Sequence, residues 1–248
     1  MTAPAALVTG GATRLGRFFV ETLAVAGYDI ALHYNSSEAP AEEVAVKVRA
    51  QGRDCETFQC DFERDDPSAL IAEARERFPG LAVLLNSASA YAPAPIAKTD
   101  MALLEQQFRV NLFAPFMLIR GFAESVEEGC VVNIIDNKVV RNQYPYAAYL
   151  LAKKSLDELT RMAALEFAPK IRVNAIAPGV VLPAETRSSD YLDWRVEGIP
   201  AARQGRPEHL GQALLYLLDN PFVCGQTLFV DGGESVNSVG RHSENYPG

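Results

Sequence analysis

The chain has 248 residues, of which 48% are hydrophobic and 22% are charged, and its formal net charge is −8. The negative charge and the absence of a cluster of Lys and Arg argue against a nucleic-acid partner, because binding phosphates needs a concentrated basic face. Apolar runs such as Val131–Ile135 are far shorter than the ~20 residues of a membrane-spanning helix, so we expect no membrane partner.

Short β-branched runs alternate with helical patterns along the chain. In chain order we predict strand Ala5–Thr9, helix Leu15–Ala26, strand Ile30–Tyr34, helix Glu42–Ala50, strand Cys55–Cys60, helix Leu70–Phe78 and strand Leu81–Leu85. Then follow helix Leu103–Ser125, strand Cys130–Ile135, helix Tyr149–Phe167, strand Ile171–Ala177, helix Leu210–Leu218 and strand Thr227–Val230. Only Ser188–Pro207 and the segment after Asp231 look irregular. Strands that are apolar on both faces, with helix-length crossovers, predict one doubly wound, Rossmann-like α/β domain (residues 1–248) with a seven-stranded parallel sheet.

The cysteines and the first residues bear on cell compartment. Cys55, Cys60, Cys130 and Cys224 show no C-x-x-C pairing and lie mostly in apolar stretches, so we expect reduced thiols and no metal site. Met1-Thr2-Ala3-Pro4 has no basic flank and leads into a strand pattern, so we expect no signal peptide and a cytoplasmic location.

A glycine-rich loop joins the first predicted strand to the first predicted helix: Thr9-Gly10-Gly11-Ala12-Thr13-Arg14-Leu15-Gly16. Gly10 and Gly16 permit a tight turn and a close approach of the backbone to a pyrophosphate, which would lie at the positive end of the helix. A purely structural turn would also explain such a loop, but the strand before it and the amphipathic helix after it favour a dinucleotide site. We expect cofactor contacts from Gly10, Arg14, Leu15 and Gly16.

The end of the second predicted strand bears on the choice of cofactor. Folds that prefer NAD place an Asp or Glu there for the ribose 2′-hydroxyl. This strand ends in His33-Tyr34-Asn35-Ser36-Ser37, without a carboxylate that would repel a 2′-phosphate. The guanidinium of Arg14 suits that phosphate, so the sequence favours NADP(H). The alternative is that Arg14 is a solvated residue of the first helical turn and His33 only fills the strand end.

Tyr149-Leu150-Leu151-Ala152-Lys153 lies on a predicted helix, where a spacing of four residues places Tyr149 and Lys153 on one face. A free tyrosine titrates near ~10, and a neighbouring ammonium is expected to lower that pKa toward the neutral range. The motif resembles the Tyr-x-x-x-Lys signature of the short-chain dehydrogenase/reductase family. That resemblance implies a nicotinamide-dependent oxidoreductase.

Further motifs of this family follow in order along almost the whole chain. The resemblance implies cofactor contacts for Asp61-Phe62 at the adenine, for the turn Asn86-Ser87-Ala88-Ser89, and for Pro178-Gly179-Val180 beside the nicotinamide. It implies that Asn111, with Pro115 four residues later, links a water molecule to Lys153. Asp231-Gly232-Gly233 matches the C-terminal signature of the family.

Asp136 is the main departure from the family, most members of which carry a serine thirteen residues before the tyrosine. A serine hydroxyl donates a hydrogen bond to a substrate carbonyl as it becomes an alkoxide. An ionised aspartate cannot donate and repels the developing negative charge. Asp136 therefore disfavours ordinary ketone reduction and suits a substrate with N–H groups or a ring nitrogen that must be protonated.

The chain most resembles the pteridine reductases and bacterial dihydromonapterin reductases, through Arg14-Leu15-Gly16, Asp136 and Ser89-Ala90-Tyr91-Ala92-Pro93. This implies that Tyr91 stacks on a pterin, that Ser89 contacts cofactor phosphate and pterin, and that Trp194 belongs to the substrate loop. Alternatively, Tyr91 and Trp194 merely cover loops. Two departures are Ser36, where relatives often have Arg, and a loop around Trp194 that is shorter than in the parasite enzymes.

The leading hypothesis is NADPH-dependent reduction of a C=N bond in a pterin ring, on a dihydromonapterin, dihydrobiopterin or dihydrofolate-like substrate, with Asp136, Tyr149, Lys153 and Asn111 as catalytic residues. The alternative is an NADPH-dependent carbonyl reductase, acting on a 3-oxoacyl or other ketone substrate, in which a protonated Asp136 donates. A non-enzymatic cofactor sensor would need neither Tyr149 nor Lys153. Similar proteins are mostly tetramers, so the resemblance also implies a homotetramer, with which the apolar stretch Phe108–Ile119 is compatible.

Overall fold

The computed structural model describes residues 3–182, 189–237, 241 and 247, whose strands form one parallel sheet in the order β3-β2-β1-β4-β5-β6-β7. The strands are β1 (Ala5–Val8), β2 (Asp29–Tyr34), β3 (Cys55–Gln59), β4 (Leu81–Asn86), β5 (Gly129–Ile134), β6 (Ile171–Pro178) and β7 (Thr227–Val230). The predicted seven-stranded parallel sheet is confirmed, and each strand begins and ends within one residue of its predicted bounds.

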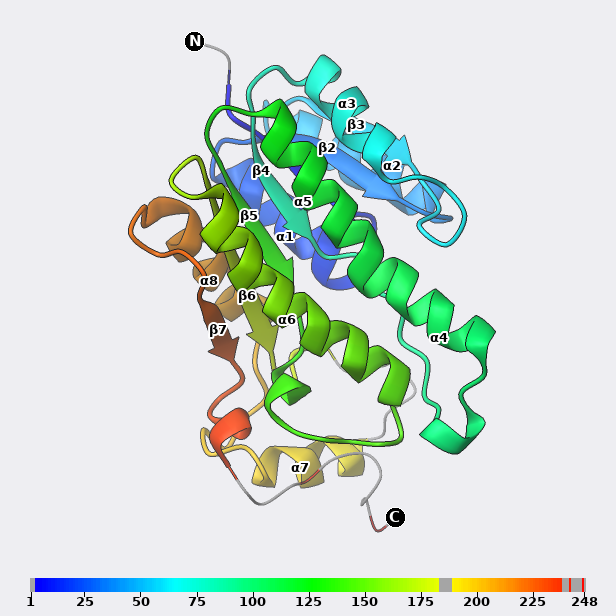
Figure 1. Ribbon diagram of the computed structural model, residues 1–248. Coiled ribbons are helices and arrows are strands. Elements are labelled where there is room, and N and C mark those ends of the chain that lie inside the picture. The colour runs from blue at the N-terminus through cyan, green and yellow to red at the C-terminus, as the bar shows by residue number, and fades with distance from the viewer. Residues whose placement is uncertain (1–2, 183–188, 238–240, 242–246, 248) are drawn as a thin grey trace.

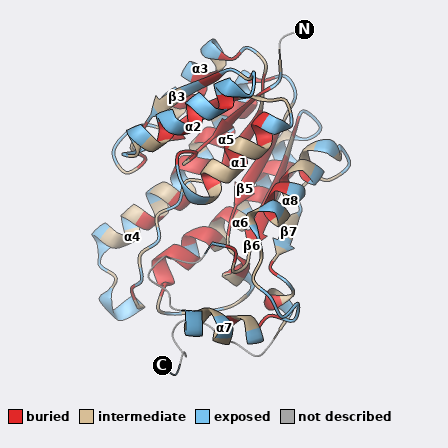
Figure 2. Ribbon diagram, turned by 180° about the vertical axis from the view of Figure 1, so that it is seen from behind, coloured by how far each residue is buried: buried red, intermediate tan, exposed pale blue. Residues whose placement is uncertain are grey.

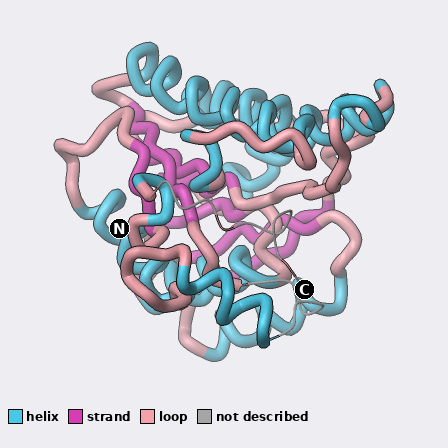
Figure 3. The backbone as a smooth tube through the Cα atoms, turned by 90° about the horizontal axis from the view of Figure 1, so that it is seen from below, coloured by secondary structure: helices cyan, strands magenta, loops and turns pink. Residues whose placement is uncertain are grey.

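Helices cover both faces of the sheet and make a three-layered α/β molecule (Figures 1 and 3). One face carries α1 (Arg14–Val25), α2 (Glu38–Ala50) and α8 (Pro207–Asp219). The other face carries α3 (Ser68–Arg77), α5 (Ala114–Ser125) and α6 (Ala147–Phe167). The β-α-β crossovers place β2 on one side of β1 and β4 on the other, which produces this doubly wound arrangement.

The core lies in two apolar layers on either side of the sheet, and burial is densest in the strands and the inner faces of the helices (Figure 2). Successive residues of a strand point to opposite faces. Accordingly Ala6 and Val8 of β1 pack with the α1 layer, while Ala5 and Leu7 pack with the α5 layer. This is why the strand sequences are apolar without alternation.

Two predicted segments differ from the structure. The predicted helix Leu103–Ser125 is observed as α4 (Met101–Phe108), a π-helical turn over Arg109–Phe113, and α5. The prediction that Ser188–Pro207 is irregular is wrong, because it contains α7 (Ser189–Glu197); Ser188 itself lies outside the described residues. In α7 only Arg195 is buried, so no apolar period marks the helix in the sequence.

The strand order also positions a crevice. The chain runs from β1 to β2 and β3 on one side and then crosses to β4 on the other, so the connections that leave β1 and β4 diverge. Ligands of such sheets bind at this switch point, beyond the carboxyl ends of the strands. Within the described residues, no helix is both long enough and apolar enough to cross a lipid bilayer.

Candidate active site

A cleft of about 780 Å³ opens at the carboxyl ends of the strands, at the switch point between β1 and β4. The residues predicted from the sequence that line it are Gly10, Arg14, Leu15, Gly16, His33, Tyr34, Asn35, Ser36, Ser37, Phe62, Ser87, Ala88, Ser89, Tyr91, Asp136, Tyr149, Lys153, Pro178 and Gly179. Motifs far apart in the sequence therefore meet in one site. The predicted residues outside this lining are Asp61, Asn86, Asn111, Val180 and Trp194.

The loop between β1 and α1 can form only with glycine at two of its positions. Gly10 has a φ of +65°, and a Cβ there would lie 2.9 Å from the Cα of Ala88. A Cβ on Gly16 would lie 1.9 Å from the carbonyl oxygen of Gly10. The loop backbone and the first turn of α1 are thereby exposed to the cleft, and the N–H groups of that turn can receive an anion.

His33 supports this loop from beneath. Its Nδ1 accepts a hydrogen bond from the N–H of Gly10 at 3.1 Å, and its Nε2 donates to the carbonyl oxygen of Cys60 at 2.9 Å. Its ring also stacks on Phe62, with 4.3 Å between the ring centroids. Burial lowers the pKa of His33 to about 4. His33 is therefore neutral at physiological pH and offers no positive charge to a phosphate.

Arg14 and Glu63 bring opposite charges to the lining of the cleft. In this structure Nη2 of Arg14 donates to the carbonyl oxygen of Leu182 at 2.6 Å, across the mouth of the cleft. Glu63, which the sequence interpretation did not consider, lines the cleft and accepts from Nε2 of Gln106 at 2.8 Å. The predicted contact between Arg14 and a 2′-phosphate stays a prediction.

The catalytic candidates meet where β5 ends beside the start of α6. The hydroxyl of Tyr149 donates to Oδ2 of Asp136 at 2.9 Å. The Nζ of Lys153 donates to the carbonyl oxygen of Ile134 at 2.9 Å and lies 5.9 Å from the centroid of the Tyr149 ring. The geometry joins an acid, an acceptor and a buried cation within one pocket.

The pKa of Tyr149 differs from the value expected from the sequence. Burial and the negative charge of Asp136 raise the pKa of Tyr149 well above its ordinary value, so the prediction that Lys153 lowers this pKa is wrong for the structure. Burial also lowers the pKa of Lys153 to about 8, although Asp136 opposes that shift. Tyr149 is consequently held as a neutral hydroxyl that carries its proton into the cleft.

Asn111 fixes the loop that follows β4. It lies on the π-helical turn and is fully buried. Its Oδ1 accepts from the hydroxyl of Ser89 at 2.8 Å, and its Nδ2 donates to the carbonyl oxygens of Ala90 and Gln107, both at 2.9 Å. Asn111 thus positions Ser89, while its predicted link through water to Lys153 stays a prediction.

Asn86 and Asp61 act behind the cleft surface. Asn86 donates from Nδ2 to Oδ1 of Asn133 at 2.8 Å and so ties β4 to β5. Asp61 accepts from the backbone N–H of Glu63 at 3.0 Å, which shapes the turn after β3. Thr9, not predicted, accepts at Oγ1 from the backbone N–H groups that follow Asn86.

Three tyrosines pack together as an aromatic wall, of which Tyr91 and Tyr149 line the cleft while Tyr146 stacks on Tyr91 outside that lining. The Tyr91 ring is stacked on that of Tyr146, with centroids 4.9 Å apart, and meets the Tyr149 ring edge-on at 4.8 Å. Tyr146 was missed from the sequence, although it precedes Tyr149 by three residues. Trp194 lies instead on α7, where the guanidinium carbon of Arg241 is 5.5 Å from the centroid of the Trp194 ring. The aromatic wall suits a flat ring substrate.

Comparison with known proteins identifies the class to which this fold and site belong. Residues 10–235 match the family model described as enoyl-(acyl carrier protein) reductase. The chain belongs to the short-chain dehydrogenase/reductase family, whose members are oxidoreductases.

Several individual proteins are similar to this chain along most of its length. Pteridine reductase 1 of Leishmania tarentolae is 31% identical, over 95% of this chain and 97% of that protein. The 3-oxoacyl-[acyl-carrier-protein] reductase FabG of Staphylococcus epidermidis is 29% identical, over 92% and 97%. Among solved structures, the chain is similar to FolM alternative dihydrofolate reductase 1 from Brucella canis complexed with NADP, with a TM-score of 0.90 and 34% identity over 94% of both chains. The Brucella suis enzyme with NADP gives a TM-score of 0.87 and 33% identity, over 94% and 95%.

Proposed function

We propose that this chain is an NADPH-dependent reductase of a C=N bond in a pterin ring. One observation carries the proposal: a carboxylate, Asp136, takes the hydrogen bond of the Tyr149 hydroxyl, where ketone reduction calls for a second donor. The similarity to Leishmania pteridine reductase 1 and to the NADP complexes of Brucella FolM supports it.

The cleft fits a dinucleotide. The crowding at Gly10 and Gly16 leaves the loop backbone bare, and the N-terminus of α1 faces the same space. Asn35, Ser36 and Ser37 line the cleft at the end of β2 and bring no negative charge to a 2′-phosphate. NADPH, when bound, supplies the hydride.

A change at Arg14 tests the choice of cofactor. Arg14→Ala should weaken NADPH binding about tenfold or more and NADH binding much less, because a charge-assisted contact to the 2′-phosphate is lost. Titrating both cofactors into wild type and variant gives the answer. Equal losses for both would show that Arg14 does not hold the phosphate.

The residues of the site can complete the reduction. Hydride addition to the ring carbon leaves the adjacent nitrogen needing a proton, and the product gains one C–H and one N–H bond. Tyr149 holds the proton that the ring nitrogen would gain, and solvent would restore that proton to Tyr149 after turnover, while Asp136 can accept hydrogen bonds from N–H groups of the substrate. Tyr91 would cover one face of the flat ring and thereby exclude water.

The second candidate is a carbonyl reductase, favoured by the similarity to 3-oxoacyl reductases. It requires that Asp136 be protonated, because only then can the carboxyl donate to an alkoxide. Measuring NADPH oxidation by the wild type in parallel on dihydropterins and on a panel of ketones decides between the two. Turnover of ketones with none on dihydropterins would overturn the pterin proposal.

We also propose that the chain is a cytoplasmic homotetramer. On the outer side of α5 and α6, large apolar side chains are exposed: Phe116 is 51%, Met162 65% and Leu165 86% accessible. A face of this kind is typical of an interface between subunits.

A further inference from the structure

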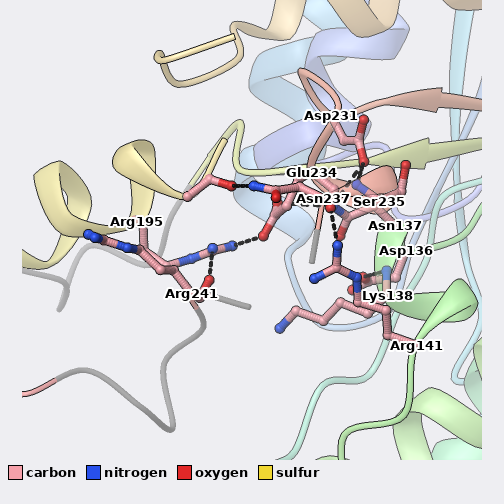
Figure 4. A network of polar contacts seen from close by, with 11 residues as sticks. Asp136, Asn137, Lys138, Arg141, Arg195, Asp231, Glu234, Ser235, Asn237 and Arg241 are labelled. Carbon is pink, nitrogen blue, oxygen red and sulfur yellow. Dashed lines mark hydrogen bonds and ion pairs between the residues drawn. The ribbon is translucent and has the colours of Figure 1, made fainter. Parts of the chain in front are cut away.

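A buried ion pair lies outside the cleft, between α7 and the turn after β7. Nη2 of Arg195 is 2.7 Å from Oε1 of Glu234, and the side chains are only 5% and 11% exposed. Arg195 also donates to the backbone carbonyl of Arg241 (Figure 4). Burying two charges is costly unless further hydrogen bonds satisfy them, so the remaining contacts of Glu234 show what the pair does.

Those contacts lead to the turn that follows Asp136. This 3₁₀ turn, η3 (Asn137–Val140), begins with Asn137, whose Nδ2 donates to Oε2 of Glu234 at 3.0 Å. Just beyond the turn, the guanidinium of Arg141 donates to the backbone carbonyl of Glu234. One residue of the C-terminal turn thus holds both ends of η3, and Figure 4 shows these side chains converging on Glu234.

The same turn sets the direction of the Asp136 carboxylate. The backbone N–H of Lys138 donates to Oδ1 of Asp136 at 2.8 Å, which leaves Oδ2 for the hydroxyl of Tyr149. A continuous chain of contacts therefore runs from Arg195 through Glu234 and η3 to Asp136. Movement of the turn would turn the carboxylate away from Tyr149.

We propose that Glu234 is a positioning residue of the active site, which holds η3 so that Asp136 keeps its hydrogen bond to Tyr149. The negative charge on Glu234 is balanced by Arg195, which extends the same support to α7. If the ion pair only anchored α7, losing it would not change turnover specifically through Asp136. The proposal concerns this geometry and holds for any substrate that the site reduces.

Two variants cut the chain of contacts at different places. Glu234→Gln leaves one acceptor oxygen for two donors, Arg195 and Asn137, and removes the charge. Asn137→Ala removes the side-chain hydrogen bond between η3 and Glu234 but leaves the ion pair and the contact from Arg141 in place. Glu158→Gln is the matched control, because Glu158 pairs with Arg161 at 2.6 Å on the surface, with its side chain 68% exposed.

Hydrogen exchange of the backbone gives the first test and needs no substrate. Amides of residues 137–141 should exchange about tenfold faster in Glu234→Gln and in Asn137→Ala, because contacts to a charged group hold the turn closed. Exchange in Glu158→Gln should match the wild type. Unchanged protection of the turn in the folded variants would overturn the proposal, whatever the enzyme reduces.

A double-mutant cycle gives the second test. On whichever substrate the wild type reduces, Glu234→Gln should lower kcat about tenfold in the wild-type background and less than about twofold in the Asp136→Asn background, since the effect passes through Asp136. The Kd of NADPH should stay within about twofold, because the dinucleotide part of the cleft is untouched. Equal losses in both backgrounds would show a general structural role and overturn the proposal. If Glu234→Gln does not fold, Asn137→Ala takes its place in the same cycle.

Discussion

Two hydrogen bonds fix the orientation of the Asp136 carboxylate, one from the Tyr149 hydroxyl and one from the backbone N–H of Lys138. Both are donated to the carboxylate, which suits the ionised form, and neither gives it a proton to pass to an alkoxide. A hydroxyl at the same position would both donate and accept. On the proposed function, the residue at 136 would therefore decide whether the site favours a nitrogen or an oxygen as the atom that gains the proton.

Substitutions at Asp136 test this directly. Asp136→Asn should reduce turnover of a dihydropterin by about a hundredfold or more, the scale of general acid–base assistance. Asp136→Ser should also lower that turnover but allow weak carbonyl reduction, because the repulsion of an alkoxide is gone. Steady-state assays of wild type and both variants on one dihydropterin and a ketone panel measure the change. Full pterin turnover in Asp136→Asn would contradict the role assigned to the carboxylate.

His33 makes stability depend on pH. Its folded pKa of about 4 lies below the ordinary value of 6.5, so the unfolded chain binds this proton more readily. The stability contributed by neutral His33 is complete above 6.5 and is lost as pH falls toward 4. Between about pH 7 and about pH 5 the loss should be about 2 kcal/mol. Urea unfolding of wild type and His33→Gln at both pH values measures the loss of stability. The loss should be correspondingly smaller in His33→Gln, and an equal loss in both proteins would refute the role assigned to His33.

At the scale of elements, the phosphate loop depends on the absence of a side chain. Gly16→Ala would press a Cβ against the backbone of Gly10, which cannot move without disturbing its bond to His33. We expect NADPH affinity to fall about tenfold or more and stability to drop by about 1–3 kcal/mol. Gly121→Ala in α5 is the control, since its Cβ would meet Ile71 at an ordinary 3.6 Å and should be neutral or stabilising. Thermal unfolding and cofactor titration compare the two, and equal effects would argue against a special role for the loop.

Elements with a strong apolar pattern were predictable, and those without one were not. The seven strands follow from runs that are buried on both faces, and Tyr149 and Asp136 could be paired in advance because family motifs fix their places. The pattern around Asn111 predicted a continuous helix but not its π-helical turn, and the helix around Arg195 carries no apolar period. Glu234 could not be found from the sequence, because its partners are near only after the chain has folded.

For the whole molecule, the strand order explains why the site is where it is. β1 and β4 are neighbours in the sheet but send their following segments to opposite faces, which opens the cleft between them. Residues that the sequence scatters over more than a hundred positions, from Gly10 to Pro178, therefore line one space. Asp136 and Tyr149, the proposed catalytic residues, line this same space beside Tyr91.

The last prediction concerns the outer face of α5 and α6. Figure 1 shows these helices side by side over one face of the sheet. Leu165, at 86% exposed, would lie in the tetramer interface, and Leu165→Glu should split the tetramer by placing an unpaired charge in an apolar contact. Val25→Glu is the control, because Val25 is equally apolar and 79% exposed but ends α1 on the opposite face. Light scattering coupled to gel filtration measures the mass of each. A wild-type monomer, or a Leu165→Glu variant that stays tetrameric, would exclude this face as the interface.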